Sequence, residues 1–266
     1  MLFYILPILI LIYLFLLRGR HGHPGLRNIR GWKYAHRGLH NAVFPENSMG
    51  AFRKAVEAGY GIELDVHLMA DGKLAVIHDS LLARTTGLPG RIEELTAADL
   101  PNCKLTGCNE GIPLFTDVLK MVDGRVPLIV ELKAENNNHI TLTQAVCEVL
   151  DEYKGVFCVE SFDPRCVQTV KKIRPHIIRG QLAHNSLWEK SSVPWLLRFV
   201  CTNLLMNFLC VPDFVAYRYK DRKCLSVFLC RKFWGLQGVS WTIKNVDDWN
   251  TAIKEDWVTI FEGFSP

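Results

Sequence analysis

The chain has 266 residues, of which 49% are hydrophobic and 22% charged, and its formal net charge at pH 7 is +4. This length suits one α/β barrel or two small domains, and the composition excludes a largely disordered chain, a collagen and a coiled coil. The positive excess precedes Glu46, where six basic and no acidic residues occur. The body of the chain therefore has no basic surplus of the kind that indicates nucleic-acid binding.

The first predicted element is an apolar helix, interpreted as a transmembrane anchor over residues 1–18. Leu2–Leu17 contains no charge, and a helix of roughly 17 residues just spans a thin bilayer. A signal peptide would need a basic start and a small-residue cleavage site, and neither is present. A buried core helix is the other alternative, but such helices are rarely apolar all round. The basic residues follow the span, so the positive-inside rule predicts a single-pass membrane protein with a cytoplasmic catalytic domain.

Residues 19–31, GRHGHPGLRNIRG, are predicted to form a basic juxtamembrane linker. The nine cysteines all follow residue 100 and include no C-x-x-C pair, so we interpret them as reduced structural thiols.

From Trp32 onward, short β-type runs alternate with amphipathic helical stretches, the first of which follows Asn47 as a predicted cap. Such alternation predicts a parallel sheet closed into a (β/α)8 TIM-type barrel over residues 32–266. Leu74–His78 would be an extra strand after the second main strand, followed by a small insertion over about 79–113. The predicted strands are Trp32–His36, Gly61–His67, Leu74–His78, Val126–Leu132, Val156–Phe162, Ile177–Leu182, Phe214–Ala216, Gly238–Thr242 and Val258–Phe261.

Polar residues gather at the ends of these strands. Glu63 and Asp65 stand two residues apart in one strand, so both carboxylates point to the same face. They would repel each other unless a cation lay between them, and Glu131 would complete a three-carboxylate site for a hard cation. Lys133 would then lie beside a bound phosphate. Together with His36, Arg37 and His78, these residues predict metal-assisted phosphoryl chemistry at the carboxyl ends of the strands.

In its motifs the chain resembles the glycerophosphodiester phosphodiesterase family over roughly Trp32 to Pro266. The residues that carry the resemblance are His36-Arg37-Gly38, Pro45-Glu46-Asn47-Ser48, Glu63-Leu64-Asp65-Val66, His78-Asp79, Glu131-Leu132-Lys133, Ser161-Phe162 and Trp241-Thr242.

The resemblance implies a TIM-type barrel that hydrolyses glycerophosphodiesters to sn-glycerol 3-phosphate and an alcohol, with one Ca²⁺ or Mg²⁺. It implies that His36 and His78 are the general acid and base. The metal ligands would be Glu63, Asp65 and Glu131, and the phosphate contacts Arg37 and Lys133. Phe162 and Trp241 match aromatic positions near the substrate, although Trp241 also suits the barrel core, and Glu46 and Asn47 belong to the motif without a defined role. The last strand departs from the family pattern, with Glu262 near the usual acid.

Val193–Tyr217 is unusually apolar, and a basic stretch follows it to Lys232. Two interpretations of residues 193–232 remain open: contact with a membrane, or an outer barrel helix with a solvated loop. A membrane contact would suit lysophospholipids, which gives lysophospholipase D activity as the alternative function. A non-enzymatic, membrane-tethered binding protein is disfavoured because the catalytic motif residues are intact.

Overall fold

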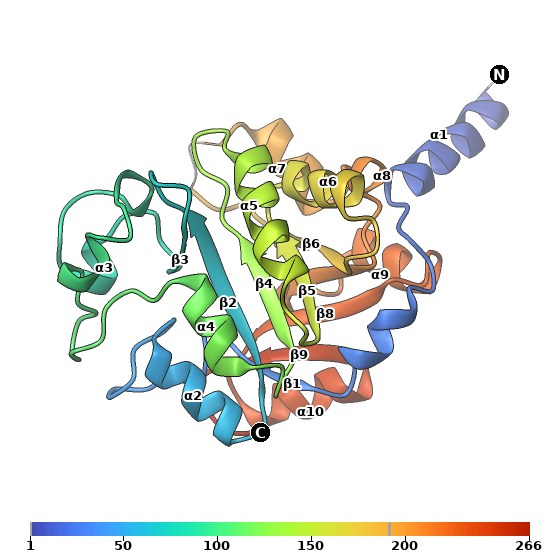
Figure 1. Cartoon of the computed structure of the whole chain (residues 1–266). Helices are drawn as coiled ribbons and strands as arrows, with labels where there is room; N and C mark the ends of the chain where they lie inside the picture. The colour runs from blue at the N-terminus through green and yellow to red at the C-terminus, as the bar shows by residue number, and fades with distance from the viewer. Residues whose placement is uncertain (1, 191–192) are drawn as a thin grey trace.

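A computed structural model describes residues 2–190 and 193–266, and its strands form one sheet that closes on itself (Figure 1). β1 pairs with both β9 and β2, which joins eight parallel strands into a barrel, while β3 pairs antiparallel with β2 outside it. The predicted TIM-type barrel is thereby confirmed. The strands are β1 (Lys33–Ala35), β2 (Gly61–Leu68), β3 (Leu74–Val76), β4 (Leu128–Leu132), β5 (Phe157–Ser161), β6 (Arg179–Ala183), β7 (Phe214–Arg218), β8 (Gln237–Ile243) and β9 (Trp257–Phe261).

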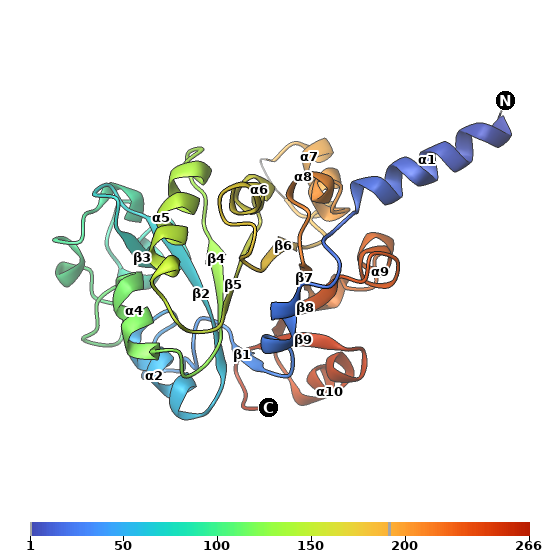
Figure 2. The same ribbon diagram turned by 45° about the vertical axis from the view of Figure 1, so that its right-hand side comes forward.

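Helices cover the outside of the barrel (Figures 1 and 2). In α4, Phe115, Val118, Leu119 and Val122 are buried, which is the spacing that puts one apolar stripe on the sheet. The helices are α1 (Leu2–Leu16), α2 (Met49–Glu57), α3 (Ala83–Thr86), α4 (Phe115–Val122), α5 (His139–Asp151), α6 (Pro164–Ile173), α7 (Trp195–Thr202), α8 (Asn207–Cys210), α9 (Leu225–Lys232) and α10 (Val246–Lys254), with 3-10 turns η1 (Pro24–Asn28), η2 (Ile92–Glu94), η3 (Leu100–Asn102) and η4 (Tyr219–Asp221).

The two faces of β2 carry different side chains. Ile62, Leu64 and Val66 pack in the core beneath the helices, whereas Glu63 and Asp65 alternate with them toward the barrel interior. Deeper in that interior, apolar side chains such as Phe214 and Ile260 fill the space. The carboxylates therefore stand above an apolar floor, at the end of the barrel where the strands finish.

The chain between β3 and α4 forms a lobe with its own apolar core, which includes Leu82, Ile92 and Leu100. The lobe lies beside the carboxyl end of β2 (Figure 1). It contributes side chains to the same edge of the barrel as β2.

Residues 19–31 pack against the barrel, although they were predicted to be a linker. Leu26 and Ile29 are buried in the barrel core, and Arg20 forms an ion pair of 2.5 Å with Asp213, just before β7. The segment thus closes the amino-terminal end of the barrel, because its few apolar residues cover apolar side chains that would otherwise be exposed there.

The N-terminal helix is shorter than the predicted span over residues 1–18. α1 has 15 residues, and a bilayer crossing needs about 20. Nowhere in residues 2–190 and 193–266 is a helix long and apolar enough to cross a membrane, so the structure does not support the transmembrane anchor. α1 leaves the body between α8 and α9 and projects beyond it (Figures 1 and 2).

Two local expectations also change. Ser48, and not Asn47, caps α2, since its hydroxyl accepts a hydrogen bond from the amide of Ala51. The apolar stretch 193–217 forms two short helices, α7 and α8, in place of one, and it ends in β7, which confirms the predicted strand Phe214–Ala216. Burial of β7 inside the barrel accounts for the last four apolar residues of that stretch, whereas Trp195 and Leu196 on α7 are exposed.

Candidate active site

Three buried carboxylates converge at the carboxyl ends of β2 and β4. Glu63, Asp65 and Glu131 each offer an oxygen, and these oxygens lie within 4.8 Å of one another. The register explains the convergence, because Asp65 is paired with Glu131 across the two parallel strands. The structure therefore brings together the three residues predicted as metal ligands.

The electrostatics of this cluster suit a cation. Burial, together with repulsion from Asp65 and Glu131, raises the pKa of Glu63 well above its usual value. Burial raises the pKa of Glu131 to about 7, although Lys133 opposes it. Oδ1 of Asp65 is buried and accepts no hydrogen bond from the described residues. Such a set of oxygen donors fits a hard divalent cation, Ca²⁺ or Mg²⁺.

His36 follows β1 and is oriented by a carboxylate from the end of β9. Its Nδ1 lies 2.7 Å from Oε2 of Glu262, while its Nε2 lies 3.9 Å from Oε2 of Glu63. An ionised carboxylate only accepts, so Nδ1 carries the proton and neutral Nε2 faces the cluster as a base. Burial lowers the pKa of His36, and the hydrogen bond to Glu262 opposes this shift.

His78 has the same arrangement from the other side of the cluster. Its Nδ1 lies 2.5 Å from Oδ1 of Asp79, and burial lowers its pKa against the opposing effect of Asp65. Arg84, on α3 of the lobe, donates to both Asp79 and Glu46. A third histidine, His67, lies on β2. Its Nε2 is 3.1 Å from the carbonyl oxygen of His78 and so supports the backbone there.

The loop after β1 supports the cluster with backbone and side-chain groups. Arg37 donates its amide to Glu63 at 3.0 Å and its guanidinium to Glu46 at 2.8 Å. Asn47 donates to Oδ2 of Asp65 at 2.9 Å. Arg37 and Asn47 both have a φ of 54°, a left-handed conformation that costs free energy in residues other than glycine and is concentrated at functional sites. The structure thereby gives Glu46 and Asn47 defined contacts. Glu46 binds the guanidinium groups of Arg37 and Arg84, and Asn47 binds the carboxylate of Asp65.

Lys133 lies on the other flank of the cluster. Its ammonium group is 2.9 Å from Glu131 and 3.4 Å from Asp65, and these charges outweigh burial to raise its pKa. With Arg37, it lowers the pKa of Asp65 although burial alone would raise it. Two permanent cations thus flank the space in which a phosphate would meet the carboxylates.

The opposite side of the barrel mouth is aromatic. Phe162 and Trp241 meet edge to face with ring centroids 5.6 Å apart, and His184 contacts both rings. A cavity of about 40 Å³ joins these aromatics to His36, Glu63 and His78. The predicted acid/base, metal, phosphate and aromatic residues consequently surround one mouth.

Glu160 was missed by sequence reasoning. It is buried on β5, lines the same cavity, and its Oε2 has no hydrogen-bond partner among the described residues. Burial and repulsion from Glu131 raise its pKa well above the usual value. Its register opposite Glu131, at the end of a predicted strand, is the signal that would have found it.

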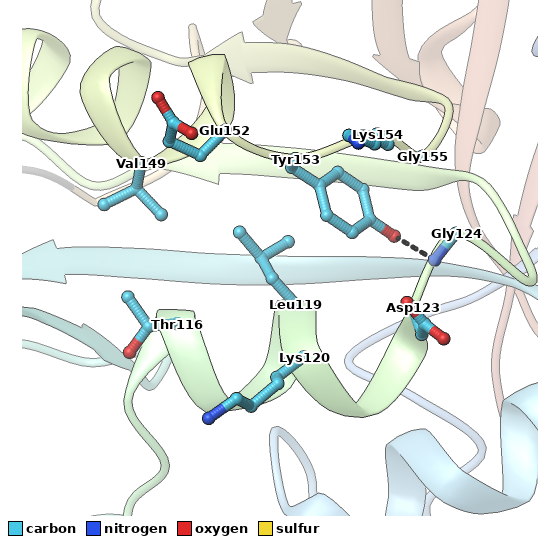
Figure 3. A pocket seen from close by; sticks show the side chains of 10 residues that line it. All are labelled: Thr116, Leu119, Lys120, Asp123, Gly124, Val149, Glu152, Tyr153, Lys154 and Gly155. Atoms are coloured by element: carbon cyan, nitrogen blue, oxygen red, sulfur yellow. Dashed lines mark hydrogen bonds between the residues drawn. The ribbon is translucent and has the colours of Figure 1, made fainter.

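Size does not distinguish this site from other cavities. A pocket of about 680 Å³ lies between α4 and the end of α5, and Figure 3 shows its lining, where the hydroxyl of Tyr153 accepts a hydrogen bond from the amide of Gly124. Lys120 and Lys154 share its wall with Asp123 and Glu152, and none of its described lining residues is a histidine. The convergence of titratable groups, not volume, identifies the catalytic mouth.

Comparison with known proteins agrees with this geometry. Residues 36–259 match the model of the glycerophosphoryl diester phosphodiesterase family. The chain is 30% identical over 235 residues to a glycerophosphodiester phosphodiesterase of Caldanaerobacter subterraneus, with 83% of this chain and 88% of that protein covered. It is 33% identical to a rat lysophospholipase D over 122 residues, which cover 41% of this chain and 38% of that enzyme.

Solved structures share the fold. An Oleispira antarctica phosphodiesterase in complex with sn-glycerol-3-phosphate superposes with a TM-score of 0.73 at 22% identity, covering 88% of this chain and 94% of that one. A glycerophosphodiester phosphodiesterase from Thermotoga maritima gives 0.67 at 24% identity, covering 87% and 95%.

Proposed function

Because the chain belongs to the glycerophosphoryl diester phosphodiesterase family, and is therefore a phosphodiesterase, we propose how its own residues hydrolyse a glycerophosphodiester to sn-glycerol 3-phosphate and an alcohol. The observation that carries the proposal is the single mouth in which two carboxylate-oriented histidines face a three-carboxylate cluster.

Glu63, Asp65 and Glu131 would hold one divalent cation, Ca²⁺ or Mg²⁺. When bound, it supplies Lewis-acid polarisation of a phosphoryl oxygen. Arg37 and Lys133 stabilise the negative charge that develops on the phosphoryl oxygens. Arg37 and Lys133 already contact Asp65, so their side chains are positioned before the substrate arrives.

His36 and His78 move the protons. One histidine removes the proton of the nucleophile, whose oxygen bonds to phosphorus, and the other protonates the alkoxide as its bond to phosphorus breaks. The nucleophile is either water or the neighbouring glycerol hydroxyl, which would give a cyclic phosphate that water then opens. Glu262 and Asp79 keep each ring in the tautomer that leaves Nε2 free.

Phe162 and Trp241 would hold the alcohol portion, since they form the apolar side of the mouth. One observation favours lysophospholipase D activity as the second candidate: apolar side chains are exposed next to this mouth. Trp188, in the segment that follows His184, is 91% exposed, and α7 follows with Trp195 and Leu196 exposed. Such a rim suits the acyl chain of a lysophospholipid.

We also propose that α1 attaches the enzyme to a membrane, with the catalytic domain on the cytoplasmic side. Eight large apolar side chains between Ile5 and Phe15 of α1 are exposed, and all nine cysteines are free thiols, which suits a reducing compartment. Protease accessibility in intact and opened cells tests the orientation: degradation of the domain in intact cells would contradict it.

Product analysis tests the function. The full chain is incubated with glycerophosphocholine and lysophosphatidylcholine side by side, with Ca²⁺, with Mg²⁺ and with chelator. We expect metal-dependent glycerol 3-phosphate from the first. Lysophosphatidic acid from the second substrate alone would establish the lysophospholipase D alternative. No product from either substrate by folded, metal-supplied protein would contradict both.

A further inference from the structure

The outward surface of η4 and α9 combines apolar side chains with lysines. Leu225, Phe228 and Phe233 are 64%, 56% and 59% exposed. Leu225, Phe228 and Lys232 follow one another at spacings of three and four, so they share one face of α9, opposite the buried Val227 and Cys230. Exposed apolar side chains that gather on one surface beside polar residues mark an interaction site.

The lysines on this surface are not neutralised at close range. Across the described ranges 2–190 and 193–266, Lys220, Lys223 and Lys232 form no ion pair, and all three are exposed. Two of the acids nearby are already engaged: Asp221 pairs with Arg218, and Glu255 pairs with Arg222. The surface consequently carries a local positive charge.

A shallow pocket of about 310 Å³ concentrates that charge. Four cationic side chains line it with Phe228 and Trp257, and Arg231 stacks on the ring of Trp257 at 4.0 Å. The cations are Arg222, Lys223, Arg231 and Lys232. Among its described lining residues, Glu255 is the one acid. The larger pocket of Figure 3 differs, because its two lysines share the wall with two acids.

α1 extends this surface. Trp234, just after α9, donates its indole N–H to the carbonyl of Leu14, and Cys230 lies 3.6 Å from the carbonyl of Leu17. The end of α1 is thus fixed beside α9, while Ile5 to Ile12 project from the body with exposed apolar side chains (Figure 2). The positive pocket and the apolar helix belong to one side of the molecule.

We infer that this side, the α1–α9 surface (exposed residues of α1 with Lys220, Lys223, Leu225, Phe228, Lys232 and Phe233), docks on a lipid bilayer that contains anionic headgroups. The inference rests on the proposed membrane attachment and adds a second contact and the lipid class. Apolar side chains enter the acyl boundary, and the lysines remain at the level of the phosphates. Charge complementarity selects anionic lipid, because each lysine near such a surface adds to the attraction. A protein partner or a second copy of the chain would need one surface that covers the apolar side chains of α1 and also carries negative charge opposite the lysines.

The test is co-flotation of the full chain with vesicles of phosphatidylcholine alone or mixed with phosphatidylglycerol, over a lipid titration that yields partition coefficients. The variant K220Q/K223Q/K232Q removes three charges, and K73Q/K120Q/K154Q removes three exposed lysines from the far side of the molecule. We expect the first variant to lose roughly tenfold or more of the partitioning on the anionic vesicles and little on neutral ones. The control should match the wild type on both.

A second variant, L225S/F228S, separates apolar contact from charge: it should partition less on both vesicle types. Equal partitioning of wild type and K220Q/K223Q/K232Q on anionic vesicles would overturn the inference, as would an equal loss in the control. If the chain instead self-associates without lipid, through a contact that covers α1 and persists when vesicles are added, the inference is overturned. That result would show that a second copy of the chain occupies this surface. Hydrolysis of soluble glycerophosphocholine, measured in the same preparations, should be unchanged by these substitutions. A thermal melt checks folding even if no hydrolysis occurs, so failure of the proposed reaction remains distinguishable.

Discussion

The two halves of the barrel mouth differ in chemistry. The ends of β1, β2 and β4, with the adjoining lobe, supply charged groups that contact one another directly, as in the chain from Arg84 through Asp79 to His78. The ends of β5 and β8 supply the rings of Phe162 and Trp241, which contact each other and leave the indole N–H of Trp241 without a partner among the described residues.

This difference separates reaction from recognition. Phosphoryl transfer needs fixed charges in a dry site, and the polar half provides them through mutual ion pairs and hydrogen bonds. An alcohol of variable structure needs adaptable contact area, which aromatic side chains provide. Substitutions in the polar half should therefore abolish turnover, whereas those in the aromatic half should alter substrate preference.

The largest effect is expected from the carboxylate cluster. Asp65→Asn removes one negative charge from the centre of the site, so we expect the rate of glycerol 3-phosphate release to fall about a thousandfold or more. Calorimetric titration with Ca²⁺ or Mg²⁺ should show weakened binding. The control is Asp117→Asn, on the exposed face of α4, which should behave as the wild type. Normal rates in Asp65→Asn would contradict the metal assignment.

The histidines come next. His36→Ala and His78→Ala should each reduce kcat about 10²–10⁴-fold, since each removes one proton-transfer group. His176→Ala, on an exposed loop, is the matched control. Near-full activity in His36→Ala, measured under saturating substrate, would exclude it as an acid or base.

A smaller effect is expected when the partner of His36 changes. Glu262→Gln keeps the shape but removes the charge that stabilises imidazolium, so kcat should fall about tenfold to a hundredfold. Burial already lowers the pKa of His36, and Glu262 opposes that shift. Its loss lowers the pKa further, so the pH limb set by His36 should move to lower pH, with Glu57→Gln as control. A limb that moves upward would contradict this coupling.

The smallest effect is expected in the aromatic half. Trp241→Leu removes the edge-to-face contacts with Phe162 and His184, and we expect KM to rise about threefold to tenfold with kcat nearly unchanged. The ratio of kcat/KM for glycerophosphocholine to that for lysophosphatidylcholine should change as well. A hundredfold loss of kcat would show that the two halves are not separate in function.

The sequence predicted the carboxylate cluster more fully than the groups that support it, for a physical reason. Glu63 and Asp65 obey strand alternation, and β2 and β4 are paired in register, so spacing alone brings them to Glu131. The closed barrel was predicted from a different pattern, the alternation of β-type runs with helical stretches along the chain. Arg84, by contrast, reaches Glu46 and Asp79 from a lobe whose path depends on its own core, and no local pattern reports that.

Two expectations for the N-terminal segment failed because hydrophobicity does not specify what an apolar residue packs against. Residues 19–31 are short of acids, yet Leu26 and Ile29 pack against the barrel floor. The N-terminal run forms a helix as predicted, but with 15 residues it is too short for the span that its composition indicated.

The most direct test of the separation between the halves is the rate of glycerol 3-phosphate release from glycerophosphocholine by chelator-treated full chain, before and after titration with Ca²⁺ or Mg²⁺. We predict that chelation abolishes release, that one of the two cations restores it in the wild type and in Trp241→Leu, and that neither restores it in Asp65→Asn. Undiminished release in the presence of chelator would contradict the account.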